Sequence, residues 1–446
     1  MERLVKRRTA LALLGMPAAL SLGSVLTGCS KNAQDSAPAI SATDLTADVK
    51  DAALTQEPIA NALTDQTTMH ALFDFTSRLL QGTYPTDQQA NVLVSPLSAL
   101  FALALAETGA AGDTLSQLES ATGMDINSLA TYLGAYARRI SGEDLYDTQQ
   151  KGDALALKCA NSIWLRSSED LSVSDDYLAT CKGTLDAQAF SAPFDSTTVD
   201  DINSWVSSKT DGMIDRLVER ITADDQLFLI NALAFDDAWQ EPYEEGDIQG
   251  DTFTTEEGDE QSVRMMHSYE MTYLENSLAE GFLKPYEKFN FAFVALLPKK
   301  GVQLADLVAS LDGTSLRDLI ANPISNIEAS AGLPKFSLDY QTTLNDQLAA
   351  MGVRVAFDPK LADFSRMATL KDGNLAISTV LQKTFIDVNE TGTKAAAVTA
   401  IGVSGSTATP DEPEVREVIL DRPFVYFIID NMTLTPLFAG VMASMG

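Results

Sequence analysis

The stretch VNETGTKAAAVTA, residues 388–400, is the part of the chain that decides between possible folds. Gly392 can act as a backbone hinge because glycine adopts conformations that other residues avoid. Strand side chains alternate between two faces, so four small residues would share one face of a strand: Thr393, Ala395, Ala397 and Thr399. A strand with so little bulk on one face can enter a crowded sheet. Taken by itself, however, the alanine-rich run 394–398 favours a helix.

The whole chain has the composition of a large soluble globular protein. It has 446 residues, of which 45% are hydrophobic and 21% are charged, and such a chain can bury a sizeable core. Length alone suggests two or three domains. No Pro- or Gly-rich linker and no internal repeat divides the sequence after residue 63. We therefore expect one large domain over residues 64–446.

The N-terminus is typical of an export signal. Four basic residues among the first eight precede an apolar run, residues 9–26, which ends in Leu26-Thr27-Gly28-Cys29. This ending matches the lipobox of bacterial lipoproteins, so we expect residues 1–28 to be removed as a signal peptide and Cys29 to be acylated. Each buried methylene of a lipid adds about 0.8 kcal/mol to membrane binding. The alternative is a plain secretory signal in which Cys29 is incidental, and the export route stays open.

The residues after Cys29 are expected to hold the folded part away from the membrane. Residues 30–63 are rich in Ser, Ala, Asp and Thr and lack a steady apolar period, which is typical of a disordered tether. A flexible chain of this length spans about 30 Å. We expect residues 29–63 to form a lipidated cysteine and tether, and the protein to lie at the cell surface, on the outer face of a bacterial membrane.

The net charge argues against several kinds of partner. The formal net charge is −31, and the first 28 residues hold four basic residues and one acidic residue, so removing their +3 leaves −34. Such a charge disfavours nucleic acid, heparin-like polymers and anionic lipid as partners. Contact with the membrane is therefore expected through the lipid anchor only.

Residues that usually bind metals or carry out catalysis are scarce. With only His70 and His267 in the chain, a histidine-based metal site or catalytic triad has little material. We expect neither a metal nor a cofactor. Cys159 and Cys181 are as consistent with a disulfide as with two buried thiols.

Hydrophobic periodicity predicts helices and strands that are mixed without strict alternation, which is typical of an α+β fold. The expected helices are residues 64–81, 97–108, 113–122, 174–182, 198–210, 304–310 and 343–351. The expected strands are residues 91–95, 155–165, 227–235, 291–297, 327–334, 376–388 and 423–430.

Six separated segments resemble the serpin family, and they follow in that family's order. They are NVLVSPLS at 91–98 with LAETGAAGDTLSQL at 105–118, INSWVSSKTDGMIDRLV at 202–218, NALAFDDAW at 231–239, LPKFSLDYQTTLNDQLAAMGV at 333–353, the stretch 388–400, and DRPFVYFIIDNMTLTPLFAGVM at 421–442. The resemblance covers nearly all of residues 64–446. It also reverses the preference for a helix at 394–398.

The resemblance implies the serpin fold, with three β-sheets, eight or nine helices and an exposed reactive-centre loop at about residues 390–415. It also implies the family's mechanism, in which a serine or cysteine protease attacks the loop and forms an acyl-enzyme. The cut loop then inserts into the central sheet and the protease is trapped. The chain is accordingly expected to be a monomeric inhibitor of serine proteases and not an enzyme.

The resemblance further assigns roles to residues of the loop. The hinge comprises Glu390, Gly392, Thr393, Ala395 and Ala397. Counting from Glu390 by the family's spacing places the reactive bond between Ser406 and Thr407. The loop is longer than usual, and an insertion before the bond would move the cut toward Ala408-Thr409. Lys394 stands where the family usually has glutamate, and it would face solvent after insertion.

A polar cluster controls opening of the central sheet in the family, and Ser95, Ser98 and Asn231 match it here. Its fourth member is usually histidine, but the register places Gln382 there. An amide can still donate and accept hydrogen bonds, whereas a response to pH should be lost. Trp239 is expected at the top of the sheet, either controlling its opening or filling the core. Asp236-Asp237 replaces the usual Lys-Gly without an evident reason.

Two other functions stay open. The chain could be a non-inhibitory serpin that acts as a binding or interaction protein, although such members tend to carry bulky, charged or proline residues in the hinge. It could also be a surface lipoprotein of another class, such as a solute-binding protein or a hydrolase. That class requires a ligand pocket or a catalytic histidine, and the sequence offers neither clearly.

The bait residues predict which proteases attack the loop. Residues 402–409 are only Gly, Val, Ser, Thr and Ala, so we expect elastase-like enzymes, whose specificity pockets are small. Digestion with elastase followed by mass spectrometry should locate a cut after Ser406 or within the three residues that follow it. Cleavage after Ser406 by a trypsin-like enzyme contradicts this prediction.

Overall fold

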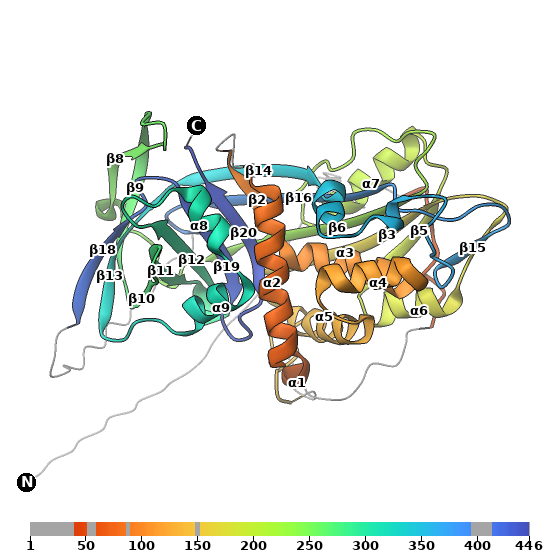
Figure 1. The fold of residues 1–446 in the computed structure, drawn as a ribbon, viewed down its shortest axis with the longest axis horizontal. Coiled ribbons are helices and arrows are strands. Elements are labelled where there is room, and N and C mark those ends of the chain that lie inside the picture. Colours follow the sequence, from red (N-terminus) through yellow and green to blue (C-terminus); the bar gives the residue numbers. More distant parts are fainter. Residues whose placement is uncertain (1–39, 51–58, 86–89, 148–151, 394–412, 446) are drawn as a thin grey trace, which may run out of the picture. The chain divides into compact units, whose positions relative to one another are not determined.

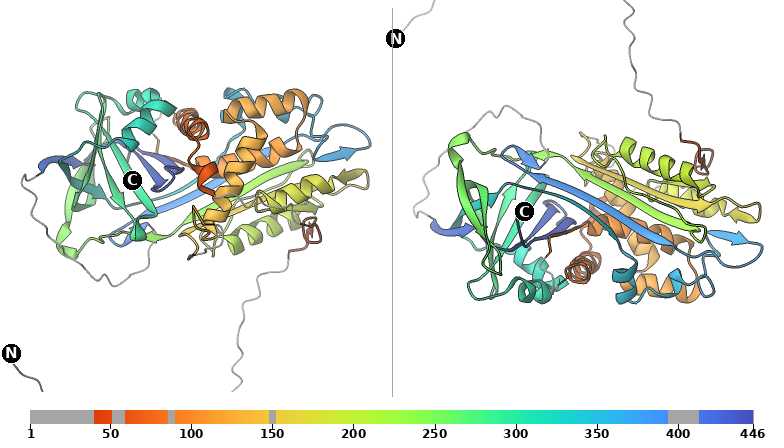
Figure 2. Two further views of the ribbon diagram at one scale, coloured as in Figure 1. Left: turned by 90° about the horizontal axis from the view of Figure 1, so that it is seen from below. Right: turned by 90° about the horizontal axis from the view of Figure 1, so that it is seen from above.

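The computed structural model describes residues 40–50, 59–85, 90–147, 152–393 and 413–445. These residues belong to one unit of the chain, Ile40–Gly446. Within them lie ten α-helices and twenty β-strands (Figures 1 and 2). This mixture of elements confirms the expected α+β class.

The helices and strands have the following bounds. The helices are α1 (Ile59–Leu63), α2 (Gln66–Thr83), α3 (Pro96–Gly109), α4 (Gly112–Thr122), α5 (Ile126–Ile140), α6 (Asp175–Gly183), α7 (Ser196–Lys209), α8 (Leu304–Ser310), α9 (Gly313–Ala321) and α10 (Asn345–Ala350). The strands are β1 (Thr43–Asp44), β2 (Val92–Val94), β3 (Leu157–Arg166), β4 (Leu171–Val173), β5 (Ala187–Ala192), β6 (Leu227–Phe235), β7 (Asp237–Ala238), β8 (Ile248–Thr254), β9 (Glu260–Glu270), β10 (Thr272–Glu275), β11 (Ala279–Pro285), β12 (Phe291–Pro298), β13 (Ile327–Pro334), β14 (Phe336–Thr343), β15 (Ala368–Leu370), β16 (Thr379–Val388), β17 (Gly392–Thr393), β18 (Glu414–Ile419), β19 (Phe424–Asp430) and β20 (Pro436–Met442).

The strands form three larger sheets and one small one. The main sheet has eight strands, in the order β1-β5-β3-β6-β16-β17-β7 with β14 paired to the other side of β16. A six-stranded sheet has the order β10-β11-β12-β19-β20-β2, and a four-stranded sheet has the order β18-β13-β9-β8. The three larger sheets are those that the resemblance implied. The β15-β4 ribbon is additional, and the described helices exceed the expected eight or nine because short ones such as α1 and α10 are included.

The main sheet is covered on both faces, and for this reason β6 is apolar along nearly its whole length. Every residue of β6 is buried. Its alternate side chains belong to two separate cores: Ile230 packs with Trp205 of α7, whereas Leu229 belongs to the core that contains α3. The ribbon views show α7 on one face of this sheet and α3, α4 and α5 on the other (Figures 1 and 2).

The helix α3 begins where the sequence Ser95-Pro96 predicts a helix start. The Ser95 side chain accepts a hydrogen bond from the Ser98 backbone N–H, and Pro96 occupies the first turn. All but one of its fourteen residues are buried. This central helix carries Ser98 directly beneath the main sheet.

The segment before residue 64 corrects one sequence-based prediction. Residues 40–50 and 59–63 were expected to belong to a disordered tether, and this is wrong for both ranges. The backbone N–H groups of Ser41 and Ala42 donate to the carboxylate of Asp201 on α7, at 2.9 and 2.8 Å. β1 pairs with β5 at the edge of the main sheet, and α1 is largely buried. Residues 41–44 are held by hydrogen bonds to residues far away in the sequence. Hydrophobic periodicity reports only local patterns and therefore could not predict this structure.

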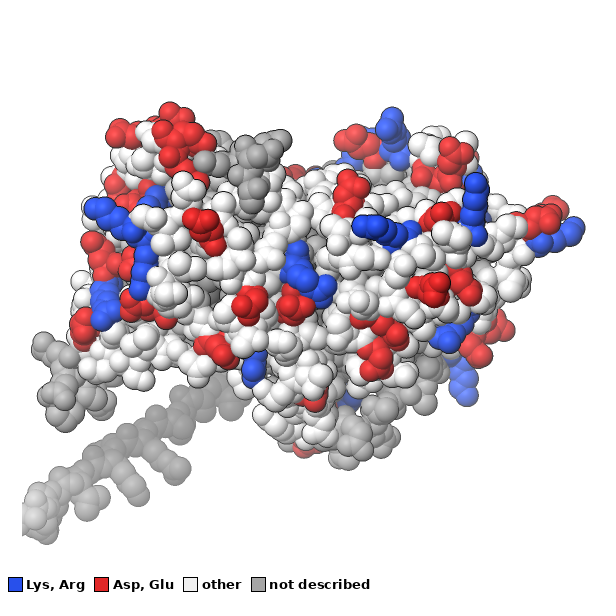
Figure 3. All heavy atoms as spheres, viewed as in Figure 1, with Lys and Arg blue, Asp and Glu red and all other residues white. Residues whose placement is uncertain are grey.

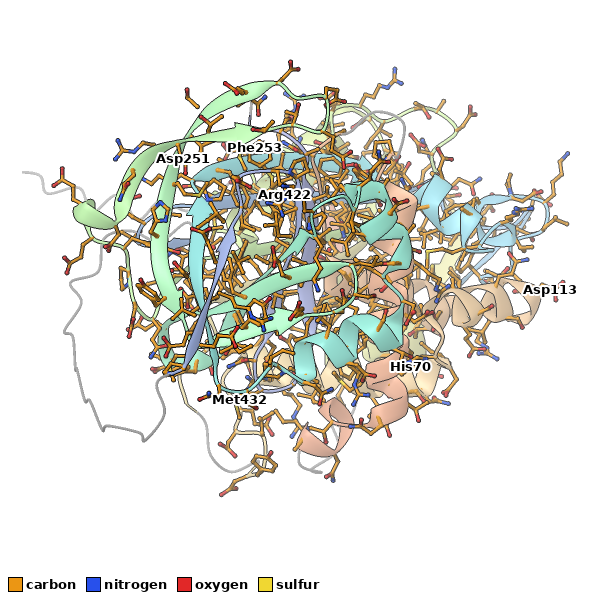
Figure 4. All side chains as sticks on the ribbon, turned by 60° about the vertical axis from the view of Figure 1, so that its left-hand side comes forward. His70, Asp113, Asp251, Phe253, Arg422 and Met432 are labelled. Atoms are coloured by element: carbon orange, nitrogen blue, oxygen red, sulfur yellow. The ribbon has the colours of Figure 1, made fainter. Side chains whose placement is uncertain are left out.

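Several regions contain elements that the sequence did not suggest, among them α5, β5, β8 to β11, α9 and β18. The helix α5 is amphipathic and lies between two expected elements. The strands β8 and β9 were also not predicted, because many of their side chains are exposed. Along β8 only Phe253 is buried, whereas Asp251 stays exposed (Figure 4). A strand without a covered face shows no clear alternation of apolar residues.

The surface is strongly acidic, especially over the β8–β9 hairpin (Figure 3). Five exposed acidic residues lie in this hairpin: Asp251, Glu256, Glu257, Asp259 and Glu260. Among the described residues, no helix has the length and apolarity to cross a bilayer, and no group of three or more His, Cys, Asp and Glu side chains is arranged to hold a metal ion. Cys159 and Cys181 are free thiols.

One buried carboxyl group makes stability depend on pH. Glu107 on α3 is 0% exposed; its Oε1 accepts a hydrogen bond from Thr122 at 3.1 Å, and its Oε2 has no partner. Burial raises the pKa of Glu107 from 4.5 to about 8. The native state therefore binds this proton more tightly than the unfolded chain does. The free energy of unfolding should fall as the pH rises from about 4.5 through about 8.

Replacing Glu107 by Gln should remove this loss of stability at alkaline pH, because a neutral amide carries no charge into the buried site. Urea unfolding at pH 5 and pH 9 should show a difference between wild type and Glu107→Gln on the order of a few kcal/mol at pH 9. The same change at the exposed Glu169 should alter neither value. An equal pH dependence in wild type and Glu107→Gln would contradict the assignment.

Candidate functional site

The strands β6 and β16 are parallel neighbours in the main sheet but pair along only part of their length. Residues Thr379–Lys383 pair with Phe228–Ala232. β16 continues to Val388 and β6 continues to Phe235. Every residue of both strands is described, and beyond these five pairs the two strands do not pair with each other. Beyond the Lys383–Ala232 pair, the sheet therefore has an opening between β16 and the β6–β7 side.

The expected hinge lies in this opening. After β16 the chain reverses direction and returns as β17, which is antiparallel to both neighbours. Thr393 faces Val388 of β16 on one side and Asp237 of β7 on the other. Its side chain is 2% exposed. Gly392 and Thr393 thus already occupy the first two positions of a strand inserted between β16 and β7.

The reversal at residues 389–391 is a turn built by Asn389. Its side-chain oxygen accepts hydrogen bonds from the N–H groups of Thr391 at 2.9 Å and Gly392 at 3.3 Å. Its own N–H donates to the Gly392 carbonyl at 3.0 Å. Asparagine favours such turns because its short side chain bonds to the backbone two residues onward.

Trp239 holds this turn by its backbone and by its ring. The Trp239 N–H donates to the Thr391 carbonyl at 2.9 Å, and its indole Nε1–H donates to the Asn389 carbonyl at 2.8 Å. Nearby, the Tyr243 N–H donates to the Glu390 carbonyl at 2.9 Å. Trp239 is 1% exposed, so it both fills core and fixes the position of the hinge.

Tyr286 extends this contact to the hinge strand. Its ring stacks on Trp239, with centroids 4.4 Å apart, and its hydroxyl lies 2.5 Å from Thr393 Oγ1. Beneath them, Lys284 Nζ forms a buried ion pair with Glu270 at 2.8 Å and lies 4.3 Å from the centre of the Tyr243 ring. A buried charge needs such partners because water no longer solvates it.

Glu390 is held by an ion pair outside the sheet. Its carboxylate contacts the ammonium group of Lys335, which lies between β13 and β14. The hydrogen bond from Lys335 lowers the pKa of Glu390 below its usual value. Lys335 belongs to the Pro-Lys-Phe segment of the sequence, so this contact ties the hinge to the strand β14 next to β16.

The expected polar cluster lies below the opening, where α3 meets the main sheet. Gln382 is 2% exposed and makes two bonds to the backbone of Ser95. Its Oε1 accepts from the Ser95 N–H at 2.9 Å, and its Nε2 donates to the Ser95 carbonyl at 2.8 Å. The amide thus uses both its donor and its acceptor, and β16 is fastened to the start of α3.

Asn231 connects α3 to two further strands. Ser98 Oγ donates to Asn231 Oδ1, and Asn231 Nδ2 donates to Asn161 Oδ1 on β3. The Asn231 amide also lies 3.7 Å from the Cys159 sulfur. Burial raises the pKa of the Cys159 thiol to about 12, so the thiol stays protonated. The structure therefore brings together all four residues of the expected cluster and adds Asn161 and Cys159.

The acidic pair before Trp239 lies at the edge of the hinge. Asp237 lines a cavity of about 340 Å³ together with Asp153, Glu287 and Lys288. Burial, with Glu287 and Asp236 nearby, raises the pKa of Asp237 to about 7. The backbone of Asp237 pairs with that of Thr393. With this raised pKa, the Asp237 side chain is only partly ionised at neutral pH.

Several expected residues lie outside the described part of the chain: Cys29, Ala395, Ala397, Ser406 and Thr407. Conversely, sequence reasoning missed Tyr286, Lys335 and Asn161. Lys335 lies in the segment 333–353, which carries part of the resemblance, so the sequence could have indicated it. Tyr286 and Asn161 gave no signal, because only the fold brings them to the hinge and the cluster. Neither histidine joins this site: His70 lies 3.4 Å from Thr314, and His267 lies on β9.

Comparisons with known proteins agree with this geometry. A family model described as serpin (serine protease inhibitor) matches residues 70–445. An uncharacterized serpin-like protein of Methanosarcina acetivorans is 30% identical over 82% of this chain and 84% of its own length. A leukocyte elastase inhibitor of Equus caballus is 28% identical over 83% of this chain and 97% of its own length.

Solved structures show the same arrangement of elements. The crystal structure of a thermophilic serpin, tengpin, in the native state is 38% identical to this chain, with a TM-score of 0.80. The match covers 90% of this chain and 99% of that one.

The bonds between Gln382 and Ser95 predict a measurable cost of removing the amide. Gln382→Ala would leave the buried Ser95 N–H without a partner, while the Ser95 carbonyl would keep the Ala99 N–H at 3.0 Å. The free energy of unfolding should fall by about 1–3 kcal/mol. Urea unfolding followed by circular dichroism would measure this loss. Gln249→Ala, on the exposed face of β8, should stay within about 0.5 kcal/mol of wild type. Equal stabilities of the two variants would show that the cluster does not fasten β16 to α3.

Proposed function

The chain belongs to the serpin family, and on this premise we propose that it inhibits elastase-like serine proteases as a suicide substrate. The protease would cut the loop after Ser406, form an acyl-enzyme, and be trapped as the cut loop enters the opening between β16 and β7. Among the relatives of this chain, two are called leukocyte elastase inhibitors and one is called a serine protease inhibitor, which supports this proposal. The chemistry belongs to the protease, so the chain itself is no enzyme.

The position of β17 is the observation that carries this proposal. Gly392 and Thr393 form the first pairs of an inserted strand, and the opening continues below them toward the Lys383–Ala232 pair. Insertion would supply antiparallel partners to both walls of the opening, and each buried backbone hydrogen bond gained stabilises the cleaved form. The small residues that follow Thr393 in the sequence suit this path.

We also propose that acylation of Cys29 anchors the protein to the outer face of a bacterial membrane. The sequence Leu26-Thr27-Gly28-Cys29 supports this placement. Ten residues separate Cys29 from Ile40, where the described structure begins. Ten residues span at most about 35 Å, so the anchored domain would stay close to the membrane and its loop would meet proteases from outside the cell.

Covalent trapping is tested by mixing the purified protein with pancreatic elastase and running a denaturing gel. We expect a stable complex of the combined mass of protease and inhibitor. Cleaved protein without a complex would contradict inhibition and favour a non-inhibitory serpin. Thermal unfolding should also occur at a higher temperature after loop cleavage, because the inserted strand adds backbone pairs.

Substitution within the hinge should convert the inhibitor into a substrate. Thr393→Arg places a long charged side chain at a position that is 2% exposed, and a charge cannot be buried there without a partner. The stoichiometry of inhibition should rise at least about tenfold, as insertion becomes slower than hydrolysis of the acyl-enzyme. Thr343→Arg, an exposed position of β14 in the same sheet, is the matched control and should leave the stoichiometry unchanged.

A further inference from the structure

The acidic pair Asp236-Asp237 stands where the resemblance implies Lys-Gly, and the proposed function gives it no task. Asp237 belongs to β7, a strand of two residues at the edge of the main sheet. Only two register pairs join β7 to the hinge strand β17, Gly392 with Ala238 and Thr393 with Asp237. Few hydrogen bonds hold so short a ladder, so a change of charge on one of its residues can decide whether it forms.

The half-buried Asp237 faces a cavity that is rich in acidic side chains. This cavity, of about 340 Å³, is also lined by Asp153, Glu287 and Lys288. Lys288 is the only cation among these lining residues, and its ammonium group already pairs with Asp153 at 3.3 Å. Within the described part of the chain, the Asp237 carboxyl group forms no ion pair of its own. A negative charge on Asp237 would therefore have little local compensation.

Charged or titratable side chains approach Asp237 from each element packed around it. They are Asp236 before it in the chain, Tyr286, Glu287 and Lys288 of the turn between β11 and β12, and Asp153 before β3. Lys394 follows Thr393 in the sequence and lies outside the described residues. Most of the placed groups are acidic, so they oppose ionisation of Asp237 instead of favouring it.

Burial is the main reason why Asp237 favours its neutral form, and it raises the pKa of this carboxyl group from 3.8 to about 7. The neutral acid is thus more stable in this arrangement than in one that leaves the group in water. As the pH rises from about 4 to about 7, arrangements that let water reach Asp237 become increasingly favourable. Above about pH 7 this effect levels off, because the group is then ionised in both arrangements.

Asp237 and its neighbours belong to the two elements that hold Thr393 on the side away from β16. The backbone of Asp237 pairs with that of Thr393, and the Tyr286 hydroxyl lies 2.5 Å from Thr393 Oγ1. Glu287 directly follows Tyr286, and Trp239, two residues after Asp237, forms a β-bridge with Tyr286. An outward shift of β7 that lets water reach the Asp237 carboxylate would therefore break the pairing with Thr393.

We propose that Asp237 is a proton-operated switch of the hinge. As the neutral acid, it lets β7 close on Thr393; as the carboxylate, it draws β7 toward water and frees the hinge from this side of the sheet. The departure from Lys-Gly thereby gains a physical reason, because glycine at this position has no group to titrate. The switch does not depend on the proposed inhibition, although a hinge already seated in the sheet would shorten the path of a cut loop into the opening.

Hydrogen exchange of the hinge tests the switch without a protease. Peptic fragments of the intact protein that contain Gly392 and Thr393 would be followed by mass spectrometry at about pH 5.5 and 7.5, with times corrected for the intrinsic effect of pH. Protection of the wild-type hinge should fall at least about tenfold between these two values. Asp237→Asn keeps the shape of the side chain without its charge, so its hinge should be equally protected at both.

Two controls separate local opening of the hinge from unfolding of the whole protein. The buried strand β12 reports on global unfolding, and the hinge should exchange at least about 100-fold faster than β12 at both pH values. Asp251→Asn, the same change at an exposed position of β8, should behave as wild type. Equal exchange rates of hinge and β12 would overturn the switch, and so would the same pH response in wild type and Asp237→Asn.

The charges of the neighbouring turn provide an independent check. Glu287→Gln removes a like charge near Asp237, so the midpoint of hinge release should move to lower pH. Lys288→Gln removes the cation and should move this midpoint to higher pH, each shift being about 0.2–0.5 of a pH unit at low salt. A common loss of structure in the turn could not produce opposite shifts. Shifts in the same direction would contradict the assignment to Asp237.

Discussion

The incomplete pairing of β6 and β16 is the constraint on which the other features of the site depend. These strands are parallel and their ladder ends at Ala232 and Lys383. Backbone groups inside a covered sheet need partners, so an opening in such a sheet costs free energy that an inserted strand would recover. β17 supplies the first pairs of that strand. The proposed inhibition uses this difference between the open and the filled sheet.

Contacts at both ends keep the opening as it is. At the lower end, Gln382 and Asn231 fasten β16, β6 and β3 to α3 through buried amides and a hydroxyl. At the upper end, Trp239 and Tyr286 hold the turn and Thr393. The lower contacts do not titrate near neutral pH. Asp237, with its pKa raised to about 7, is the group at the upper end that changes charge there.

The two ends of the loop enter different sheets. The chain leaves the main sheet at Thr393 and enters the four-stranded sheet at Glu414. The first end leads into the opening, where insertion would take place. The second end begins β18, which pairs in parallel with β13. The two ends of the loop are thus held by different sheets.

The sequence by itself determined the elements whose residues are periodic and buried. The strands at 227–235 and 327–334 and the helix at 304–310 have the expected bounds, because the local pattern of apolar residues reports burial. Family motifs also placed Ser95, Asn231 and Gln382 in one cluster. Only the tertiary structure decided that residues 40–50 are ordered and that Tyr286 meets Thr393. Each depends on contacts between residues far apart in the chain, which no local pattern encodes.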